Sequence, residues 1–286
     1  MKKRIITLFM CFFLTGMVQA ETVTVDGPWS PTGSYQKVIR LITADMEKNG
    51  WQFSTKITGN PLLSKVSAES AKSLYVLAWA TEANTKKSDA FYVGVPTDKN
   101  LIGMTHISNQ FLCGAKGLTL KDLENKKKTY KIGVGVVDTI PVNWLNDFMS
   151  YLGVKHTLVK YQGSSKSSNA LLSGEVDFVL NSKGAKMHKQ GQVNCLVVPS
   201  EQSLAGIPTV KSKYPKFDQP VLYNAMYFQA YNFNQKQLDK FRSDFKKARK
   251  NKEMKALLSS RYASEVNISI DDQIKIIKFY DSQLEK

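Results

Sequence analysis

Residues 130–180 read YKIGVGVVDTIPVNWLNDFMSYLGVKHTLVKYQGSSKSSNALLSGEVDFVL, and this stretch alternates short apolar segments with amphipathic ones. The apolar segments predict strands at 130–136, 157–161 and 176–180. Apolar residues three and four positions apart at 142–152 predict the buried face of a helix, with Asp138-Thr139 as its cap and Pro141 in its first turn. A further helix is expected at 165–173 after a Gly-Ser turn. Strands that alternate with helices indicate an α/β fold with largely parallel sheets.

The same strand–helix–strand order is found near the start of the chain. The pattern predicts a strand at 22–27, a helix at 35–49 and a strand at 51–57. Helical spacing returns near the C-terminus, at 238–248 and 254–258. No Ser/Gly-rich linker and no repeat of fixed period divides the chain.

Composition indicates a globular protein with an unusual charge. The chain has 286 residues, of which 42% are hydrophobic, enough for one large domain or two medium ones. Its formal net charge is +16. Such a charge is typical of proteins that bind nucleic acid, an anionic membrane face or a small anionic ligand.

Residues 1–20 have the pattern of a cleavable secretory signal peptide. Residues 2–4 are basic and residues 5–17 are largely apolar. Residues 18–20, which end at Ala20, place small residues at the positions that signal peptidase recognises. The mature chain is then expected to begin at Glu21 and to be located in the periplasm. No later run reaches the ~18 apolar residues of a membrane-spanning helix. Because an exported protein does not normally meet nucleic acid, no nucleic-acid partner is expected.

Two cysteines remain after the predicted cleavage. Cys113 and Cys195 both lie in apolar runs, whereas Cys11 is lost with the signal peptide. In an exported protein the pair can form one disulfide, or each cysteine can be a small buried hydrophobic residue. The sequence leaves both alternatives open.

No motif indicates catalysis. The three histidines, His106, His156 and His188, are not spaced like zinc ligands. There is no G-x-S-x-G elbow, no Walker loop and no complete G-x-G-x-x-G after a strand. We therefore expect no enzyme activity, no catalytic residue, no metal and no cofactor. The basic run at 246–252 is interpreted as the solvated face of an amphipathic helix.

Three predicted strand-to-helix turns are rich in Gly, Ser, Thr and Pro. They are Ser30–Ser34, Val137–Ile140 and Gln162–Ser165. In parallel α/β sheets such turns lie at the carboxyl ends of the strands, where ligands bind. Each turn presents backbone N–H groups at a helix N-terminus, an arrangement that attracts anions. Since the turns contain almost no Arg or Lys, the pattern suits a small organic carboxylate.

Residues 161–177, YQGSSKSSNALLSGEVD, closely resemble a segment of the Bug-type solute-binding receptors of tripartite tricarboxylate transporters. Ile207–Val210 and Pro31–Ser34 resemble two further markers of that family. The resemblance implies a two-lobed periplasmic-binding-protein (Venus flytrap) fold, in which each lobe is a mainly parallel sheet flanked by helices. Lobe one would comprise 21–111 plus 223–286, and lobe two would comprise 112–222.

The resemblance also implies a ligand site and partners. One lobe would contribute Thr32, Gly33 and Ser34, and the other would contribute Thr139, Tyr161, Gly163, Ser164 and Ser165. The ligand would be a small organic anion held between the lobes. The closed receptor, expected to be a monomer, would deliver it to membrane permease subunits.

The first turn departs from the family pattern. Thr32 stands where the family usually has a glycine, and Gln36 stands where it has an aspartate. Two other functions use the same fold. One is a sensor that reports ligand binding to a membrane signalling receptor, and the other is a secreted enzyme that uses the cleft for catalysis. Neighbouring transporter genes would favour the transport function, and a carboxylate or histidine with a perturbed pKa in the cleft would favour the enzyme.

Overall fold

The structure is a computed structural model. It describes residues 21–28, 31, 33–58, 60–81, 93–135, 140–161, 163–219 and 222–282, without the side chains of Ser34 and Tyr223. The predicted signal peptide, residues 1–20, lies outside the described residues. Within the described residues, no helix is both long enough and apolar enough to cross a membrane.

The first sheet is built from both ends of the chain. Its strands are β1 (Thr22–Asp26), β2 (Gln52–Lys56), β3 (Tyr75–Ala80), β4 (Leu101–Asn109) and β10 (Tyr223–Tyr231), in the order β2-β1-β3-β10-β4. Strand β1 pairs in parallel with β2 and β3, and β10 is antiparallel to β3 and β4. Four strands therefore run one way, and β10 alone is reversed.

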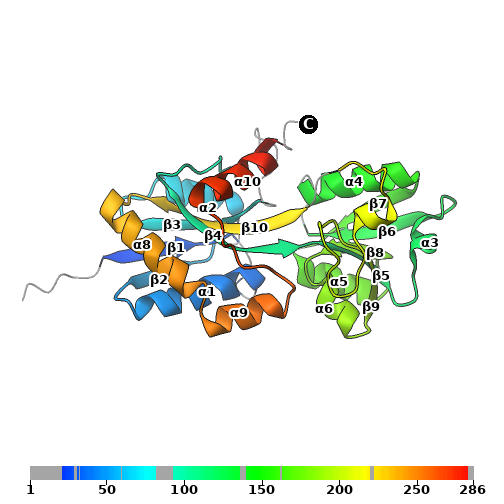
Figure 1. The fold of residues 1–286 in the computed structure, drawn as a ribbon, viewed down its shortest axis with the longest axis horizontal. Coiled ribbons are helices and arrows are strands. Elements are labelled where there is room, and N and C mark those ends of the chain that lie inside the picture. Colours follow the sequence, from blue (N-terminus) through cyan, green and yellow to red (C-terminus); the bar gives the residue numbers. More distant parts are fainter. Residues whose placement is uncertain are drawn as a thin grey trace, which may run out of the picture.

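The second sheet repeats this plan with the middle of the chain. Its strands are β5 (Phe111–Ala115), β6 (Thr129–Val134), β7 (Lys155–Lys160), β8 (Phe178–Asn181) and β9 (Val193–Val197), in the order β7-β6-β8-β5-β9. Strand β6 is parallel to β7 and β8, and β5 is antiparallel to β8 and β9. The two sheets form two lobes joined where β4 leads to β5 and where the chain returns to β10 (Figure 1). The predicted two-lobed α/β fold with mainly parallel sheets is confirmed.

Helices cover both faces of the lobe-one sheet. One face packs against α1 (Ser34–Glu47), α8 (Gln235–Ala248) and α9 (Lys252–Ser259). The other face packs against α2 (Pro61–Glu69) and α10 (Ile270–Ser282). Strand β3 lies between these layers, which explains why every residue of Tyr75–Ala80 is buried.

Lobe two has the same layered plan. On one face lie α3 (Leu120–Leu123), α4 (Ile140–Leu152) and α7 (Val210–Lys213). On the other lie α5 (Ser164–Leu172) and α6 (Gly184–Lys189). The helices predicted at 142–152 and 165–173 are therefore present, with the second beginning and ending one residue earlier than predicted.

The predicted strand at 130–136 is described only in part. Strand β6 ends at Val134, and residues 136–139 lie outside the described residues. The predicted strand at 176–180 begins two residues late, at Phe178, since the Asp177 carboxylate accepts a hydrogen bond from the Lys131 N–H at 2.9 Å.

The basic run at 246–252 is mostly exposed, as the solvated-face interpretation requires, but Arg249 is an exception. This side chain is 7% exposed, and its guanidinium donates a hydrogen bond to the Met104 carbonyl at 3.0 Å. Arg249 therefore helps to fix the end of α8 on β4, which the charge pattern alone did not predict.

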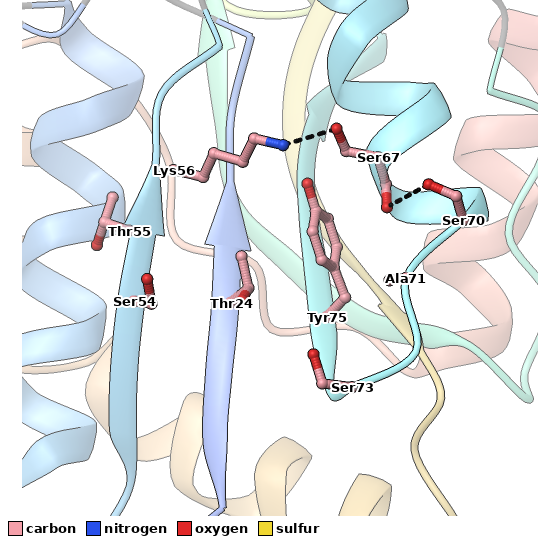
Figure 2. Close-up of a pocket in the computed structure, with 9 residues that line it drawn as sticks. All are labelled: Thr24, Ser54, Thr55, Lys56, Ser67, Ser70, Ala71, Ser73 and Tyr75. Carbon is pink, nitrogen blue, oxygen red and sulfur yellow. Dashed lines mark hydrogen bonds between the residues drawn. The ribbon is translucent and has the colours of Figure 1, made fainter.

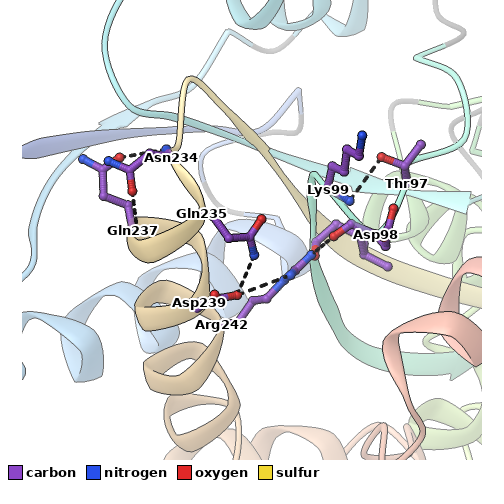
Figure 3. Close-up of polar contacts among 9 residues, drawn as sticks. Thr97, Asp98, Lys99, Asn234, Gln235, Gln237, Asp239 and Arg242 are labelled. Atoms are coloured by element: carbon purple, nitrogen blue, oxygen red, sulfur yellow. Dashed lines mark hydrogen bonds and ion pairs between the residues drawn. The ribbon is translucent and has the colours of Figure 1, made fainter.

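Arg242 fixes the middle of α8 on the same strand. Its Nε and Nη2 atoms donate to the Leu101 carbonyl at 2.9 and 2.7 Å, and Nη2 also donates to the Asp98 carbonyl (Figure 3). The Asp239 carboxylate lies 3.8 Å from Nη1. One guanidinium thus satisfies two backbone carbonyls at the start of β4.

Replacing Arg242 with alanine should lower the free energy of unfolding by about 1.5–3 kcal/mol, because hydrogen bonds from a charged donor are lost and their acceptors stay partly buried. Urea unfolding measures this loss. Lys246→Ala is the matched control, since Lys246 is exposed on the same helix and should change the free energy by less than about 0.5 kcal/mol. Equal stabilities of the two variants would contradict the assigned role of Arg242.

Cys113 and Cys195 form a disulfide in the structure. The two residues face each other on the paired strands β5 and β9. Gly184 packs directly on the sulfur atoms, since a Cβ placed there would lie 2.4 Å from Cys113 Sγ and 3.1 Å from Cys195 Sγ. The disulfide therefore forms the surface on which the start of α6 rests.

Candidate anion-binding site between the lobes

The turn between β7 and α5 presents two unpaired N–H groups. Gly163 is the N-cap residue of α5 and has φ +87°, a conformation that favours glycine. Within the described chain, the N–H groups of Ser164 and Ser165 have no hydrogen-bond acceptor. They are donors at a helix N-terminus, the arrangement that binds anions.

In lobe two, glycines allow the segments that follow β6 and β7 to lie close to each other. A Cβ on Gly135 would lie 3.7 Å from the Cα of Gly163, and a Cβ on Gly133 would lie 3.2 Å from the Tyr161 ring. The Tyr161 hydroxyl donates to Glu175 at 2.7 Å. Burial and this bond raise the pKa of Tyr161 to about 12. Tyr161 therefore supports the turn with its ring, and its hydroxyl is engaged by Glu175.

The lobe-one part of the site lies where β1 leads to α1. Gly33 is the N-cap residue of α1. The Gln36 side chain donates to the Gly27 carbonyl at 3.3 Å, and the Arg40 side chain donates to the Pro31 carbonyl at 3.2 Å. These bonds hold the turn against its own helix. The predicted contacts Thr32 and Thr139 lie outside the described residues, as does the side chain of Ser34.

The helices of the described chain differ in how they begin. A side chain caps each of α2, α3, α7, α8 and α9, from Asn60, Thr119, Thr209, Asn234 and Asn251. Helices α1, α5 and α6 have no side-chain cap, and glycine occupies the capping position in α1 and α5. The two helices predicted to face the ligand therefore lack the oxygen that often accepts their first N–H groups, a property that they share with α6.

Lys183 brings a cation to the lobe-two turn. Its Nζ atom donates to Ser165 Oγ at 2.5 Å. The buried Asn181 side chain accepts from the Lys183 N–H at 3.0 Å and donates to Ser167 and Ser168 of α5 at 3.3 and 3.2 Å. Asn181 thus joins the β8–α6 turn to the start of α5, which places the Lys183 ammonium beside the predicted turn.

Arg261 brings a second cation from lobe one. It lies two residues beyond the end of α9. Burial, with the charge of Arg261 adding to it, lowers the pKa of His106 to about 3. Burial also lowers the pKa of Lys183, and the charges of Arg261 and Lys186 lower it further. Arg261 thus contributes to the lowered pKa of a residue in each lobe.

The Arg261 guanidinium is half-buried and makes no hydrogen bond or ion pair with any described residue. The Lys183 ammonium likewise has no carboxylate partner in the described chain. Sequence reasoning missed both residues. The turn Asn181–Gly184 also follows a strand and contains serine and glycine, as predicted turns do, so that signal was available for Lys183. No local pattern marks Arg261.

Each of the three histidines lies within hydrogen-bond distance of a neighbouring polar group. His106 Nδ1 lies 2.7 Å from Thr105 Oγ1, His156 Nε2 lies 2.8 Å from Asn146 Oδ1, and His188 Nδ1 accepts from the Cys195 N–H at 3.2 Å. Across the residues that the structure describes, no three His, Cys, Asp or Glu side chains are grouped as a metal site.

A separate hollow of about 500 Å³ lies on lobe one, where residues of β1, β2, β3 and α2 line it (Figure 2). Two of its polar side chains are engaged: Lys56 Nζ donates to Ser67 Oγ at 2.7 Å, and the Tyr75 hydroxyl donates to Asp26 at 2.6 Å. All its lining residues belong to lobe one, so the hollow is distinct from the predicted site, which draws on both lobes.

Comparison with known proteins finds no matching family model and no matching curated sequence. Solved structures do match over nearly the whole chain. The R. palustris protein Rpa4515 with adipate has a TM-score of 0.78 and 15% identity, over 92% of this chain and 95% of that one. MatC from Rhodopseudomonas palustris with bound malate has a TM-score of 0.73 and 17% identity, over 92% of this chain and 97% of that one. The periplasmic binding protein BugD has a TM-score of 0.72 and 14% identity, over 92% and 95%.

These matches establish the fold as that of the periplasmic binding proteins. Within that class, the resemblance to Bug-type proteins predicted from residues 161–177 is confirmed at the level of the fold.

Proposed function

We propose that this protein is a periplasmic solute-binding protein that captures a small organic carboxylate between its two lobes. The observation that carries the proposal is the glycine-capped start of α5, where Ser164 and Ser165 present N–H groups with no acceptor among the described residues. A carboxylate supplies the missing acceptor, and the helix N-terminus favours its negative charge. The malate and adipate bound to proteins of the same fold support this ligand class.

The proposed site draws on both lobes. Lobe one, 21–111 plus 223–286, contributes Thr32, Gly33 and Ser34, and lobe two, 112–222, contributes Thr139, Tyr161, Gly163, Ser164 and Ser165. The crossings of the chain between the two sheets support this division. Closure of the lobes would remove water from these donors and strengthen their hold on the anion.

We further propose a biological role, which the fold and the predicted signal peptide support. The receptor is exported, works as a monomer in the periplasm, and delivers its ligand to the membrane subunits of a transporter of the tripartite tricarboxylate type. Binding, and not catalysis, is the proposed activity.

A thermal-shift screen of di-, tri-, aromatic and amino carboxylates tests the proposal. At a concentration about 100 times its dissociation constant, the true ligand should stabilise the native state by about 2.7 kcal/mol, because it binds only the folded protein. Neutral sugars and amines are the controls and should give no shift. The proposal fails if no carboxylate raises the melting temperature, or if only an amine or a sugar does.

A further inference from the structure

We propose that the outer surface of α8 and α9 is a membrane-docking face that holds the receptor against anionic phospholipid headgroups. The inference rests on the export and the membrane partner named in the proposed function, but not on the carboxylate site. It accounts for the net charge of +16, to which the predicted ligand turns contribute almost no Arg or Lys. Residues 235–255, which run from the start of α8 into α9, contain nine basic and three acidic residues, a net charge of +6.

The first step is the position of the lysines on the two helices. Both helices pack on the core of lobe one through their apolar residues, such as Phe241 and Leu257. Five lysines of this segment lie outside the buried faces, are exposed, and form no ion pair with any described residue. We call these five the lysine face: Lys236, Lys246, Lys250, Lys252 and Lys255.

The second step is that part of this charge opposes local stability. Lys252 is the first residue of α9, where the helix dipole favours a negative charge. Lys250 lies two residues before it, and its charge has the same sign. Since local electrostatics do not account for a lysine at this position, and departures from local stability are typical of functional surfaces, the charge points to a partner outside the chain.

The third step is the support beneath the lysine face. The other basic residues of the segment are turned to structural use. Arg242 and Arg249 donate to backbone carbonyls of β4. Lys240 Nζ lies 2.9 Å from the Asp244 carboxylate and 4.4 Å from the centroid of the Trp51 ring. The inner basic residues therefore fix α8 on the sheet, and the outer ones are presented to solvent from a rigid element.

The fourth step is the chemistry of the partner. The large exposed hydrophobic side chains of the described chain lie on α2, α4, α5, α10 and the segment before α10, and none lies on α8 or α9. Protein interfaces are centred on aromatic residues, Met and Arg, and they are depleted in lysine. Free ammonium groups without an apolar anchor suit a layer of anionic headgroups instead, because such a layer attracts every lysine near its surface.

Vesicle co-sedimentation of the mature chain tests this face. Wild type should bind phosphatidylcholine vesicles that contain about 30 mol% phosphatidylglycerol in about 0.05 M salt, and about 0.5 M salt should release it. Vesicles of phosphatidylcholine alone should bind at least about 10-fold less protein. The variant Lys246→Gln, Lys250→Gln, Lys252→Gln, Lys255→Gln should bind the anionic vesicles at least about 20-fold more weakly, since each lysine at the surface contributes roughly fivefold.

A matched variant on lobe two separates the lysine face from the net charge. Lys121→Gln, Lys155→Gln, Lys189→Gln, Lys211→Gln removes the same four charges at exposed positions. It should weaken vesicle binding less than about threefold, because the attraction falls off within a Debye length of the surface. The α8–α9 variant should melt no lower than wild type, since it loses the lysine charge at the start of α9.

Each other outcome overturns the proposal. Wild type that ignores anionic vesicles, binds both kinds of vesicle equally or stays bound in high salt has no electrostatic membrane face. Equal losses in the two quadruple variants would assign binding to net charge. If poly-glutamate binds through the lysine face and anionic vesicles do not, the partner is an acidic polypeptide. None of these measurements uses a carboxylate ligand, so the thermal-shift screen decides the proposed function separately.

Discussion

Replacing Gly163 with valine should abolish carboxylate binding while the protein remains folded. Gly163 has φ +87° and ψ 170°, a conformation that a β-branched residue avoids. Strain of this kind costs about 1–3 kcal/mol, and the turn can relieve it only by moving the N–H groups of Ser164 and Ser165. A Cβ at Gly163 would meet nothing within 4 Å, so the core is not disturbed and the circular dichroism spectrum should stay close to that of wild type.

Gly174→Val is the matched control for backbone strain. Gly174 lies just beyond the other end of the same helix, has φ +76°, and also has nothing within 4 Å of its Cβ position. Gly174→Val should lower the melting temperature to a similar extent and keep full affinity. Ser164→Ala should weaken binding by about 0.5–1.5 kcal/mol, or 1.5–3 kcal/mol if its hydroxyl bonds a charged carboxylate. If Gly163→Val binds like wild type, the lobe-two half of the proposed site is wrong.

Removing the disulfide should have the largest effect on stability. The double variant Cys113→Ala, Cys195→Ala should lose about 2–4 kcal/mol of unfolding free energy, because the cross-link closes a long loop in the unfolded chain. The two cysteines are 82 residues apart in sequence. Urea unfolding of the oxidised wild type and the double variant measures the difference.

Thiol titration is the control for this prediction. The denatured, non-reduced wild-type protein should show no free thiol, since the predicted signal peptide removes Cys11. Two titratable thiols would contradict the disulfide and leave each cysteine as a small buried hydrophobic residue.

The parts of the fold with local signals could be predicted. The units β1-α1-β2 and β6-α4-β7 show their strands and helices in the sequence, because apolar spacing and glycine stops are local properties. The reversed strands could not be located in this way. Strand β10 pairs with β3 and β4, more than a hundred residues earlier in the chain. No local pattern in the sequence of Tyr223–Tyr231 predicts which strands it pairs with.

The same distinction holds for the candidate site. The turn at Gly163 could be predicted, because a tight turn from a strand into a helix favours glycine through its local backbone conformation. Arg261 was not, since its position depends on the bridge between Ser264 and Ile107 and on the packing of Tyr262 against lobe two. Tertiary contacts set that position, and no local sequence pattern encodes them.

A crystal structure with the tightest carboxylate from the screen tests the central claim most directly. The account predicts one carboxylate group within hydrogen-bond distance of the Ser164 and Ser165 N–H groups, with the rest of the ligand between the two lobes and in contact with the start of α1. A carboxylate bound instead in the lobe-one hollow near Lys56, or one that touches a single lobe and leaves the α5 turn empty, would contradict it.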